Sequence, residues 1–289
     1  MRTFTVLVNP ISGGGQAPER VEPVAALLRE AGATVTEVLT EGPGHATEVA
    51  REAASAGLVV VAAGGDGLVR DAADGVVPAD GLMGIIPAGR GNDLARRLGW
   101  PSDPAGLAAL LLDGEPRAVD LLQCNGVQIP GNLYAGLDSA ANAMINSSRW
   151  IPAPVLYRLA PILTMLRWRP VIYRLTIDGT VTEVPGHTVV VANTGGYGHG
   201  LDIVPSAVCD DGVFDVLIAG DMPKWKIARL MREAEAGTHV EHPEMTVVRA
   251  CEITIDADRN LPVYADGDFL CDLPVTVRLR KGGLRLLRP

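Results

Sequence analysis

The chain has 289 residues, of which 47% are hydrophobic and 20% are charged, as expected for a folded protein of one large domain or two ordinary ones. Its 25 basic and 34 acidic residues give a formal charge of -9, so the whole molecule lacks the positive field of a nucleic-acid-binding protein. Lysine occurs only at positions 224, 226 and 281. A Walker-type P-loop, which needs a lysine after its glycines, is therefore excluded from the N-terminal half.

The cysteines and the apolar segments bear on the cellular location. No C-x-x-C motif joins Cys124, Cys209, Cys251 and Cys271, which argues against a zinc ribbon and favours buried thiols in a reducing compartment. The N-terminus enters a strand pattern with no signal sequence before it. The most hydrophobic segment, residues 150–168, is broken by prolines and an arginine, whereas a membrane-spanning helix needs about 20 mainly apolar residues. We therefore expect a cytoplasmic protein that does not cross a membrane.

The first 115 residues alternate short β-branched runs with helical patterns, which predicts repeated β-α units around a parallel sheet. The predicted strands are residues 3–8, 34–39, 58–62 and 82–86. The helices predicted to follow them are residues 18–31, 45–56, 67–76 and 92–98. Ligands of such sheets bind beyond the carboxyl ends of the strands, so the loops there are expected on one rim, namely 9–15, 40–44, 64–67 and 87–93.

From about Ala118 the pattern becomes β-rich, and we place a domain boundary near Asp120. One amphipathic helix is predicted over residues 223–236, among strands at 171–177, 188–192, 213–218, 246–255 and 275–279. This pattern is typical of antiparallel sheets or a β-sandwich. A last strand at 284–287 is expected to return to the first domain. The predicted domains are residues 1–120 with a returning tail at about 281–289, and residues 121–280.

The motif Gly64-Gly65-Asp66-Gly67 follows an apolar strand and opens a helix, where backbone N–H groups and the positive helix end suit a phosphate. The Asp66 carboxylate would repel a phosphate directly, so its expected use is to hold a divalent cation that bridges the phosphates. A plain tight turn is the alternative for this motif taken alone.

Two further glycine loops stand on the same predicted rim. They are Asn9-Pro10-Ile11-Ser12-Gly13-Gly14-Gly15 after the first strand and Pro87-Ala88-Gly89-Arg90-Gly91-Asn92-Asp93 after the fourth. None of the three loops completes the G-x-G-x-x-G fingerprint before a helix, which excludes an ordinary Rossmann dehydrogenase. Three such loops on one rim favour a nucleotide site over three unrelated turns.

Together these motifs resemble the diacylglycerol-kinase-like catalytic family of bacterial lipid kinases, diacylglycerol kinases, sphingosine kinases and ceramide kinases. The resemblance covers nearly the whole chain. The N-P-x-S-G, G-G-D-G and P-x-G-x-x-N-D-x-A motifs of the family match residues 9–13, 64–67 and 87–95. Four shorter motifs follow in the family's order, namely Ala118-Val119-Asp120, Gly136-Leu137-Asp138, Asp211-Gly212-Val213-Phe214 and Ala265-Asp266-Gly267-Asp268.

The resemblance implies an NAD-kinase-like α/β domain, a C-terminal β-sandwich that receives the lipid, and a nucleotide cleft between them. It also implies ATP and Mg²⁺. The candidate catalytic Mg²⁺ network is Asp66, Asp93 and Asp120, and a structural Mg²⁺ would use Asp211 with the carbonyls of Val208 and Val213. The candidate nucleotide-binding residues are Asn9, Pro10, Ile11, Ser12, Gly13, Thr40, Gly64, Gly65, Asp66, Gly67, Leu68, Val69, Arg70, Arg90 and Asn92.

The candidate general base departs from the family's pattern. The family's D-G-E supplies the base from its glutamate, whereas this chain has Asp266-Gly267-Asp268, one methylene shorter. Asp268 is the first candidate for the base and Asp266 its neighbour or substitute. A displacement of about 1 Å in an active site can cost about 10²-fold in rate.

Other departures concern the nucleotide side. Leu68 stands where most bacterial members have Thr, and Asp71 where many relatives have Glu. Arg90 replaces a Thr or Ser, and its guanidinium either donates bidentate bonds to ATP or is a solvated surface group.

Residues 149–170 combine tryptophans and leucines with flanking arginines, a pattern that suits peripheral contact with a membrane. A helix that covers the β-sandwich is the alternative. The glycine-rich run 195–200 is either a gate on the lipid path or a plain turn.

The leading prediction is an ATP- and Mg²⁺-dependent lipid kinase that phosphorylates diacylglycerol or a similar lipid, at the inner membrane surface. The alternatives are an NAD-kinase-like phosphotransferase and a catalytically weak lipid-binding pseudokinase. No nucleic-acid partner is expected, and the sequence allows a homodimer without specifying one.

Overall fold

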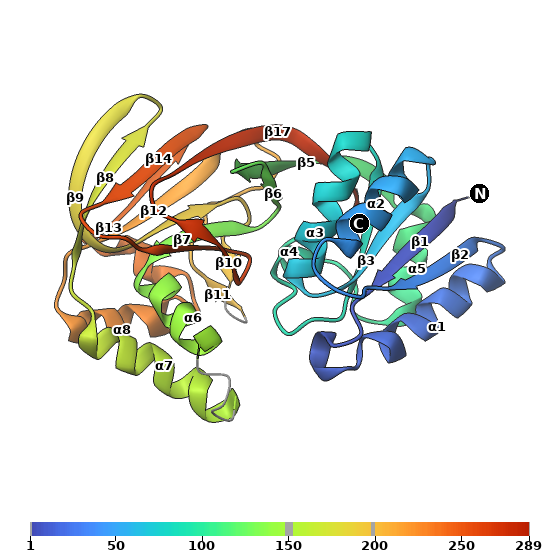
Figure 1. Cartoon of the computed structure of the whole chain (residues 1–289), viewed down its shortest axis with the longest axis horizontal. Helices are drawn as coiled ribbons and strands as arrows, with labels where there is room; N and C mark the ends of the chain where they lie inside the picture. Colours follow the sequence, from blue (N-terminus) through green and yellow to red (C-terminus); the bar gives the residue numbers. More distant parts are fainter. Residues whose placement is uncertain (1, 148–152, 198–199, 289) are drawn as a thin grey trace. The chain divides into compact units, whose positions relative to one another are not determined.

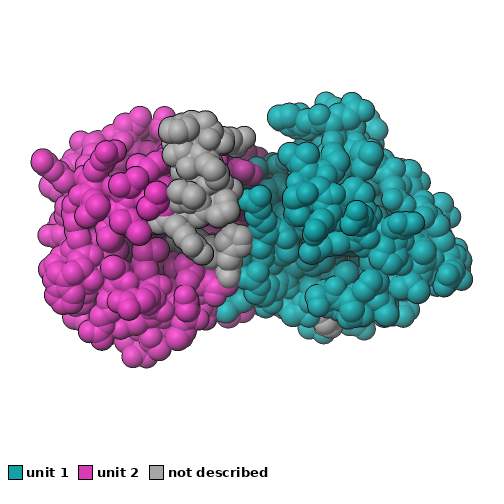
Figure 2. All heavy atoms as spheres, turned by 90° about the horizontal axis from the view of Figure 1, so that it is seen from below, with its two compact units in different colours: residues 1–121, 280–289 teal, residues 122–279 magenta. Residues whose placement is uncertain are grey.

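The computed structural model describes residues 2–147, 153–197 and 200–288. The chain forms two compact units, residues 1–121 with 280–289 (unit 1) and residues 122–279 (unit 2), which Figure 2 shows in different colours. Two strands continue from one unit into the other, β5 (Glu115–Cys124) and β17 (Val275–Arg288).

Unit 1 is built on a parallel sheet in the order β17-β4-β3-β1-β2 (Figure 1). Its strands are β1 (Thr3–Val8), β2 (Thr34–Leu39), β3 (Val59–Gly64) and β4 (Leu82–Pro87), completed by the C-terminal part of β17. Every residue of β3 is buried, as expected for a central parallel strand covered on both faces. The four predicted strands of this half agree with the structure to within two residues at each end.

The helices of unit 1 are α1 (Ala17–Glu30), α2 (His45–Ser55), α3 (Asp66–Val76), α4 (Asp93–Arg97) and α5 (Pro104–Asp113), with short 3₁₀ turns at Ser12–Gly14 and Val77–Ala79. Helix α5 was not predicted. It has a clear start, because Asp103 accepts a hydrogen bond from the backbone N–H of Gly106 at 2.8 Å and Pro104 occupies the first turn. Its sequence is apolar almost all round, so it carries no amphipathic period.

Unit 2 contains antiparallel strands whose buried side chains contribute, among the described residues, to two hydrophobic clusters. One run of pairing joins β14, β8 and the first part of β17, and another joins β16, β15, β7, β9, β12 and β13. Strand β9 belongs to both, because residues 180–186 pair with β8 and residues 188–192 pair with β7. The bounds are β6 (Val127–Ile129), β7 (Asn132–Gly136), β8 (Val171–Ile177), β9 (Thr180–Ala192), β10 (Gly196–Tyr197), β11 (Leu201–Asp202), β12 (Phe214–Gly220), β13 (Met245–Ala250), β14 (Glu252–Ala257), β15 (Pro262–Ala265) and β16 (Asp268–Asp272).

The single strand predicted at 246–255 is wrong, because the structure divides it at Cys251 into β13 and β14. The two strands have different partners, β12 for the first and β8 with β17 for the second. The Asp178 carboxylate stabilises the break, since it accepts hydrogen bonds from the N–H groups of Cys251 and Glu252 at 3.1 and 2.9 Å. No glycine or proline marks this break in the sequence.

Three hairpins of unit 2 are built alike, with Asn125-Gly126, Asp178-Gly179 and Asp266-Gly267 at their turns. Both residues of each turn have positive φ, as a type I′ turn requires. They join β5 to β6, β8 to β9 and β15 to β16. The D-G of the candidate base motif is therefore also a hairpin turn.

The helices of unit 2 are α6 (Leu137–Ser147), α7 (Ala153–Arg167) and α8 (Lys224–Glu233), with a 3₁₀ turn at Thr238–Glu241. Helix α6 was not predicted. Among the residues that the structure describes, no helix is both long and apolar enough to cross a membrane. The fold class predicted from the sequence, an α/β unit with a parallel sheet followed by a β-rich unit, is confirmed.

Candidate active site

Three glycine-bearing loops meet at the carboxyl edge of the unit 1 sheet. They follow β1, β3 and β4, and they approach backbone to backbone. A Cβ built on Gly13 would lie 2.6 Å from the carbonyl oxygen of Ala88, and one built on Gly65 would lie 3.3 Å from the Cα of Gly89. Gly13 also has a φ of +61°, which favours glycine. The expected convergence of the loops on one rim is therefore present in the structure.

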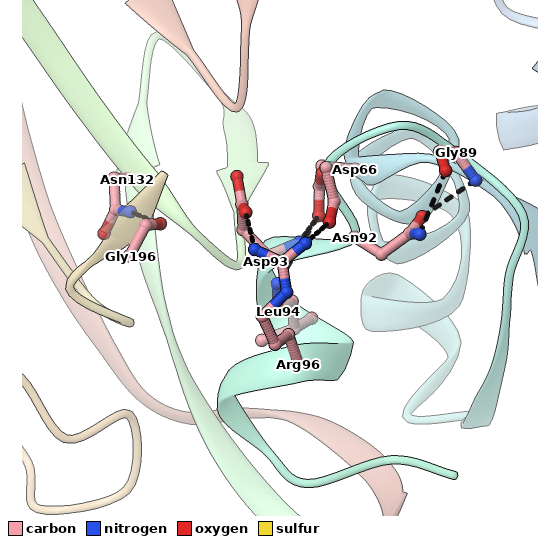
Figure 3. A network of polar contacts seen from close by, with 9 residues as sticks. Asp66, Gly89, Asn92, Asp93, Leu94, Arg96, Asn132 and Gly196 are labelled. Atoms are coloured by element: carbon pink, nitrogen blue, oxygen red, sulfur yellow. Dashed lines mark hydrogen bonds and ion pairs between the residues drawn. The ribbon is translucent and has the colours of Figure 1, made fainter. Parts of the chain in front are cut away.

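The Asp66 carboxylate lies at the centre of this rim (Figure 3). Its Oδ1 accepts hydrogen bonds from the backbone N–H groups of Asp93 at 2.7 Å and Leu94 at 3.4 Å, at the start of α4. Burial raises the pKa of Asp66 above its ordinary value of 3.8, although these backbone hydrogen bonds act in the opposite direction. Burial therefore disfavours the ionised form, and a cation beside it would compensate.

Asp93 places a second carboxylate beside the first. A Cβ on Gly91 would lie 2.8 Å from Oδ2 of Asp66 and 3.2 Å from Oδ2 of Asp93, so both oxygens face the same point. Arg96 lies 3.4 Å from Oδ1 of Asp93. Two carboxylates are a donor set that fits Mg²⁺, which usually takes one or two protein carboxylates and completes its octahedron with water and substrate phosphates.

Asp120, the third predicted member of the Mg²⁺ network, lies in β5 and is 2% exposed. Its Oδ1 accepts a hydrogen bond from the backbone N–H of Gly282 at 2.6 Å, which fixes β17 where the chain returns to unit 1. Within the described ranges, no three His, Cys, Asp or Glu side chains stand together as a metal cluster. Asp120 therefore does not complete a three-carboxylate cluster with Asp66 and Asp93.

The predicted nucleotide-binding residues differ in what they offer to a ligand. Leu68 and Val69 are buried side chains, because α3 packs them into the core of unit 1, and Leu68 covers Gly64. Their side chains are therefore closed to a ligand, and the predicted contact of these two residues with ATP would have to use their backbone. Ile11 is 81% exposed, and Arg90 is also exposed on the loop after β4.

The remaining predicted residues shape the loops. The side-chain amide of Asn92 forms two hydrogen bonds with the backbone of Gly89 (Figure 3). Its Oδ1 accepts from the N–H of Gly89 at 2.8 Å, and its Nδ2 donates to the carbonyl oxygen of Gly89 at 3.0 Å. Asn9 accepts from the N–H of Ile11 at 3.1 Å, and the N–H of Thr40 donates to the carbonyl of Val8 at 2.9 Å. The other predicted members, Pro10, Ser12, Gly64, Gly67 and Arg70, lie on the same loops or at the start of α3, where Arg70 pairs with Asp71 at 3.3 Å.

In unit 2, the two carboxylates of the candidate base motif, Asp266 and Asp268, have different surroundings. Asp266 has a φ of +49°, and its carboxylate accepts hydrogen bonds from the N–H groups of Gly131 at 3.3 Å and Asn132 at 2.8 Å. Asp268 begins β16 opposite Ala265 and is exposed. The structure thus favours Asp268 over Asp266 as the group that meets a substrate.

Asn132 is a site residue that the sequence analysis missed. It is buried, and its Oδ1 accepts from the N–H groups of Thr194 and Gly195 at 3.3 and 3.2 Å. Its Nδ2 donates to the carbonyl of Gly196 at 2.7 Å (Figure 3). Asn132 therefore joins the glycine-rich run to the turn that carries Asp268. Its partners are 62 to 64 residues away in the sequence, so no local pattern reveals the contact.

The predicted structural Mg²⁺ site at Asp211 has a different partner in the structure. Its carboxylate forms an ion pair with Arg249 and accepts from the N–H of Val213 at 3.3 Å. The Asp211 carboxylate thus already has one cationic partner, and a Mg²⁺ held there with the carbonyls of Val208 and Val213 stays a prediction.

Comparison with known proteins identifies the family. Residues 3–124 match the model of the diacylglycerol kinase catalytic domain, and residues 131–288 match the YegS C-terminal NAD kinase beta sandwich-like domain. A diacylglycerol kinase of Mycobacterium tuberculosis (strain H37Rv) is 35% identical over 99% of this chain and 94% of its own. A diacylglycerol kinase of Staphylococcus aureus (strain MRSA252) is 27% identical over 93% of this chain and 87% of its own.

Solved structures show the same fold. A crystal structure of a diacylglycerol kinase from Bacillus anthracis str. Sterne covers all of this chain and 97% of its own, with a TM-score of 0.73 and 21% identity. The two family models together cover most of the chain and meet between residues 124 and 131, close to the change of unit at residue 121, although the second model also includes residues 280–288 of unit 1. The chain belongs to the diacylglycerol kinase family.

Proposed function

We propose that the protein is an ATP- and Mg²⁺-dependent lipid kinase that transfers the γ-phosphoryl group of ATP to a hydroxyl of diacylglycerol or a similar lipid. The observation that carries this proposal is the half-buried Asp66 carboxylate on a rim of three glycine loops. A carboxylate on an anion-binding rim requires a cation to bind a nucleotide, and phosphoryl transfer depends on metal charge at the phosphates.

The backbone of unit 1 supplies most of the proposed phosphate binding. The backbones of the loops after β1, β3 and β4 approach one another closely, with no lysine in unit 1 before Lys281. Exposed Arg90 is the proposed cationic side chain on this rim, because its planar guanidinium can bind phosphate oxygens in pairs. The side chains of Asn9 and Asn92 hold the loops in shape.

Asp66 and Asp93 are the proposed metal-holding residues. Bound Mg²⁺ would supply positive charge to the β- and γ-phosphates of ATP. Asp66 is oriented by the two amides of α4, so one of its carboxylate oxygens is fixed by hydrogen bonds and the other faces Asp93. Asp120 is proposed to act indirectly, by holding β17 against β5 through Gly282.

Asp268 is the proposed general base, which accepts the proton of the lipid hydroxyl. Asp266 is a positioning residue, because its carboxylate ties the type I′ turn to the backbone of Gly131 and Asn132. Asp268 follows this turn directly, so its position depends on the hydrogen bonds of Asp266.

The acceptor places the protein at a membrane. Diacylglycerol and related lipids reside in bilayers, so we propose peripheral contact with the inner surface of the cell membrane. The experiment is to incubate the purified protein with γ-labelled ATP, Mg²⁺ and a panel of lipid alcohols, with NAD as the competing acceptor. We expect labelled lipid and no labelled NAD. Binding of ATP and lipid without any turnover would support the pseudokinase alternative, which the shorter carboxylate of Asp268 motivates.

A further inference from the structure

An aliphatic stripe lies exposed along one face of α7. Its members recur at positions i, i+3, i+4 and i+7, which places them on one side of a helix, and they are Leu159, Ile162, Leu163 and Leu166. Leu166 is 62% exposed. The opposite face packs into unit 2 through Ala160 and Thr164. Monomeric proteins rarely leave four large aliphatic side chains together in water, so this stripe indicates a partner.

Trp168 does not belong to this surface, although the sequence predicted a membrane contact over residues 149–170. It is 7% exposed and packs in the core of unit 2, with the Arg259 guanidinium 4.6 Å from its ring centre. The prediction also covers the side chains of residues 149–158, which are outside the part of the chain whose side chains the structure describes.

Helix α8 presents a second exposed face, which the sequence analysis did not assign to a membrane. Trp225 is 70% exposed, and Arg229 and Arg232 follow it at i+4 and i+7 on the same side. The opposite face is buried through Ile227 and Leu230. Arg229 pairs with Glu233 at 2.7 Å, so these two charges offset each other. Arg232 adds a further positive charge to the same face.

The two faces are connected where the helices meet. Lys224, the residue before Trp225, donates a hydrogen bond from Nζ to the carbonyl oxygen of Leu166 at 2.6 Å. The start of α8 therefore lies at the end of α7, and Figure 1 shows both helices on the same side of unit 2. Arg167 and Arg169 are exposed beside this junction.

We propose that this surface docks unit 2 on an anionic lipid bilayer. The α7–α8 surface is defined as Leu159, Ile162, Leu163, Leu166, Trp225, Arg229 and Arg232. The choice of occupant follows from charge, because the junction gathers arginines and a lysine in a chain of net charge -9. Aliphatic side chains enter the acyl boundary, Trp225 lies at the headgroups and arginines reach the lipid phosphates, as in interfacial helices. The inference rests on the proposed kinase function, which supplies the reason for a lipid partner. Binding to vesicles can nevertheless be measured without any enzymatic turnover.

The test is cosedimentation of the full chain with vesicles of phosphatidylcholine, with or without phosphatidylglycerol, in the absence of ATP. We expect binding only with phosphatidylglycerol, weakened by salt. Leu166→Glu and Trp225→Ala should each reduce vesicle affinity by about tenfold, because each removes the burial of one large apolar side chain. Val181→Glu is the matched control, since Val181 is 63% exposed in the β8–β9 hairpin of the same unit. The melting temperature of each variant checks its folding.

A second measurement locates Trp225 itself. Vesicles with brominated acyl chains should quench the fluorescence of the wild-type protein more than that of Trp225→Phe. Equal quenching of the two, or vesicle binding unaffected by Leu166→Glu and Trp225→Ala, would overturn the proposal. A dimer in light scattering that Leu166→Glu dissociates, without loss of vesicle binding, would also overturn it and assign the surface to a second copy of the chain.

A soluble short-chain diacylglycerol separates this inference from the proposed function. Variants of the α7–α8 surface should phosphorylate it at the wild-type rate, because the substrate does not need a bilayer. If the variants turn over this substrate normally and also bind vesicles as tightly as the wild type does, the docking surface alone is refuted. Normal vesicle docking with no turnover of any lipid refutes the kinase alone.

Discussion

The two units use a pair of nearby aspartates in opposite ways. In unit 1, Asp66 and Asp93 direct oxygens toward one point beside Gly91, and burial raises the pKa of Asp66. In unit 2, Asp266 is bound by two backbone amides, whereas Asp268 is exposed. The first pair concentrates negative charge that a cation can neutralise. The second pair separates a carboxylate that shapes the turn from one that can reach a substrate.

The Asp178-Gly179 hairpin shows that this second arrangement does not by itself indicate catalysis. Asp178 also begins a type I′ turn, and its carboxylate also accepts from two backbone N–H groups of a neighbouring strand. The chemistry of the Asp-Gly pair is therefore that of a hairpin in both places. Only the residue after the turn, Asp268, distinguishes the candidate site.

Neutralising Asp66 should have the largest effect on the unit 1 pair. Asp66→Asn keeps the shape and an acceptor for the amides of α4 but removes the charge proposed to hold Mg²⁺. We expect kcat for lipid phosphorylation to fall by about 10³-fold, as when a main electrostatic contact to the transition state is lost. Steady-state kinetics at saturating ATP and Mg²⁺ measure this. Asp80→Asn, at an exposed aspartate of the same unit, is the control and should leave kcat unchanged.

Removing the proposed base is the matching test in unit 2. Asp268→Ala should lower kcat by about 10²-fold, the low end for general base catalysis, because the aspartate is already shorter than the family's glutamate. Asp268→Glu should retain or raise kcat. The control is Asp272→Ala, an exposed position of the same strand. Equal activity of Asp268→Ala and wild type would remove Asp268 from the mechanism.

Filling the space between the unit 1 carboxylates probes geometry without changing charge. Gly91→Ala places a methyl group 2.8 Å from Oδ2 of Asp66, which is too close for an undisturbed pair. We expect the apparent Mg²⁺ affinity to fall by about tenfold, equivalent to about 1.4 kcal/mol. Titration of activity with Mg²⁺ measures it. An unchanged Mg²⁺ dependence would show that the metal binds elsewhere.

Asp266→Asn and Asp178→Asn compare the two hairpins directly, since Asn-Gly also suits a type I′ turn. Each loses a charged acceptor for backbone amides, so each should destabilise unit 2 by about 1–3 kcal/mol. Only Asp266→Asn should also lower kcat, by a few-fold, with KM for ATP unchanged. Melting temperatures and kinetics of both variants test this. A fall in kcat for both would reduce the role of Asp266 to general stability.

The pH dependence of stability gives the smallest predicted effect. Because the folded pKa of Asp66 is raised above 3.8, the folded state binds its proton more tightly than the unfolded state does. Its contribution to stability is thus complete below pH 3.8 and is lost as the pH rises through the folded pKa. Without metal, the melting temperature of Asp66→Asn at neutral pH should be about 2–4 °C above that of the wild type, which corresponds to about 1 kcal/mol in the free energy of unfolding. In acid the two proteins should melt at the same temperature. Mg²⁺ should stabilise only the wild type.

Features that depend on local sequence were predictable. Each glycine loop directly follows a parallel strand, so its place on the rim could be inferred from the order of β-α units. Strands β1 and β2 were bounded correctly because their hydrophobic runs end at turn residues.

Features that depend on contacts between distant residues were not predictable. Asn132 binds the glycine-rich run more than sixty residues away, and the break between β13 and β14 depends on Asp178, 73 residues before Cys251. The burial of Leu68 follows from how α3 packs on the sheet, and a sequence motif contains no information on that packing. Helix α5 was missed because its face toward solvent is as apolar as its buried face.

The most direct test of the account is transfer of label from γ-labelled ATP to diacylglycerol in mixed micelles with Mg²⁺, by the wild type, Asp66→Asn and Asp268→Ala. We predict labelled phosphatidic acid with the wild type and a loss of at least about 10²-fold with each variant. Label transfer that is equal in all three proteins would contradict the assignment of these two carboxylates. No labelled lipid from a wild-type protein that binds ATP would contradict the proposed kinase activity.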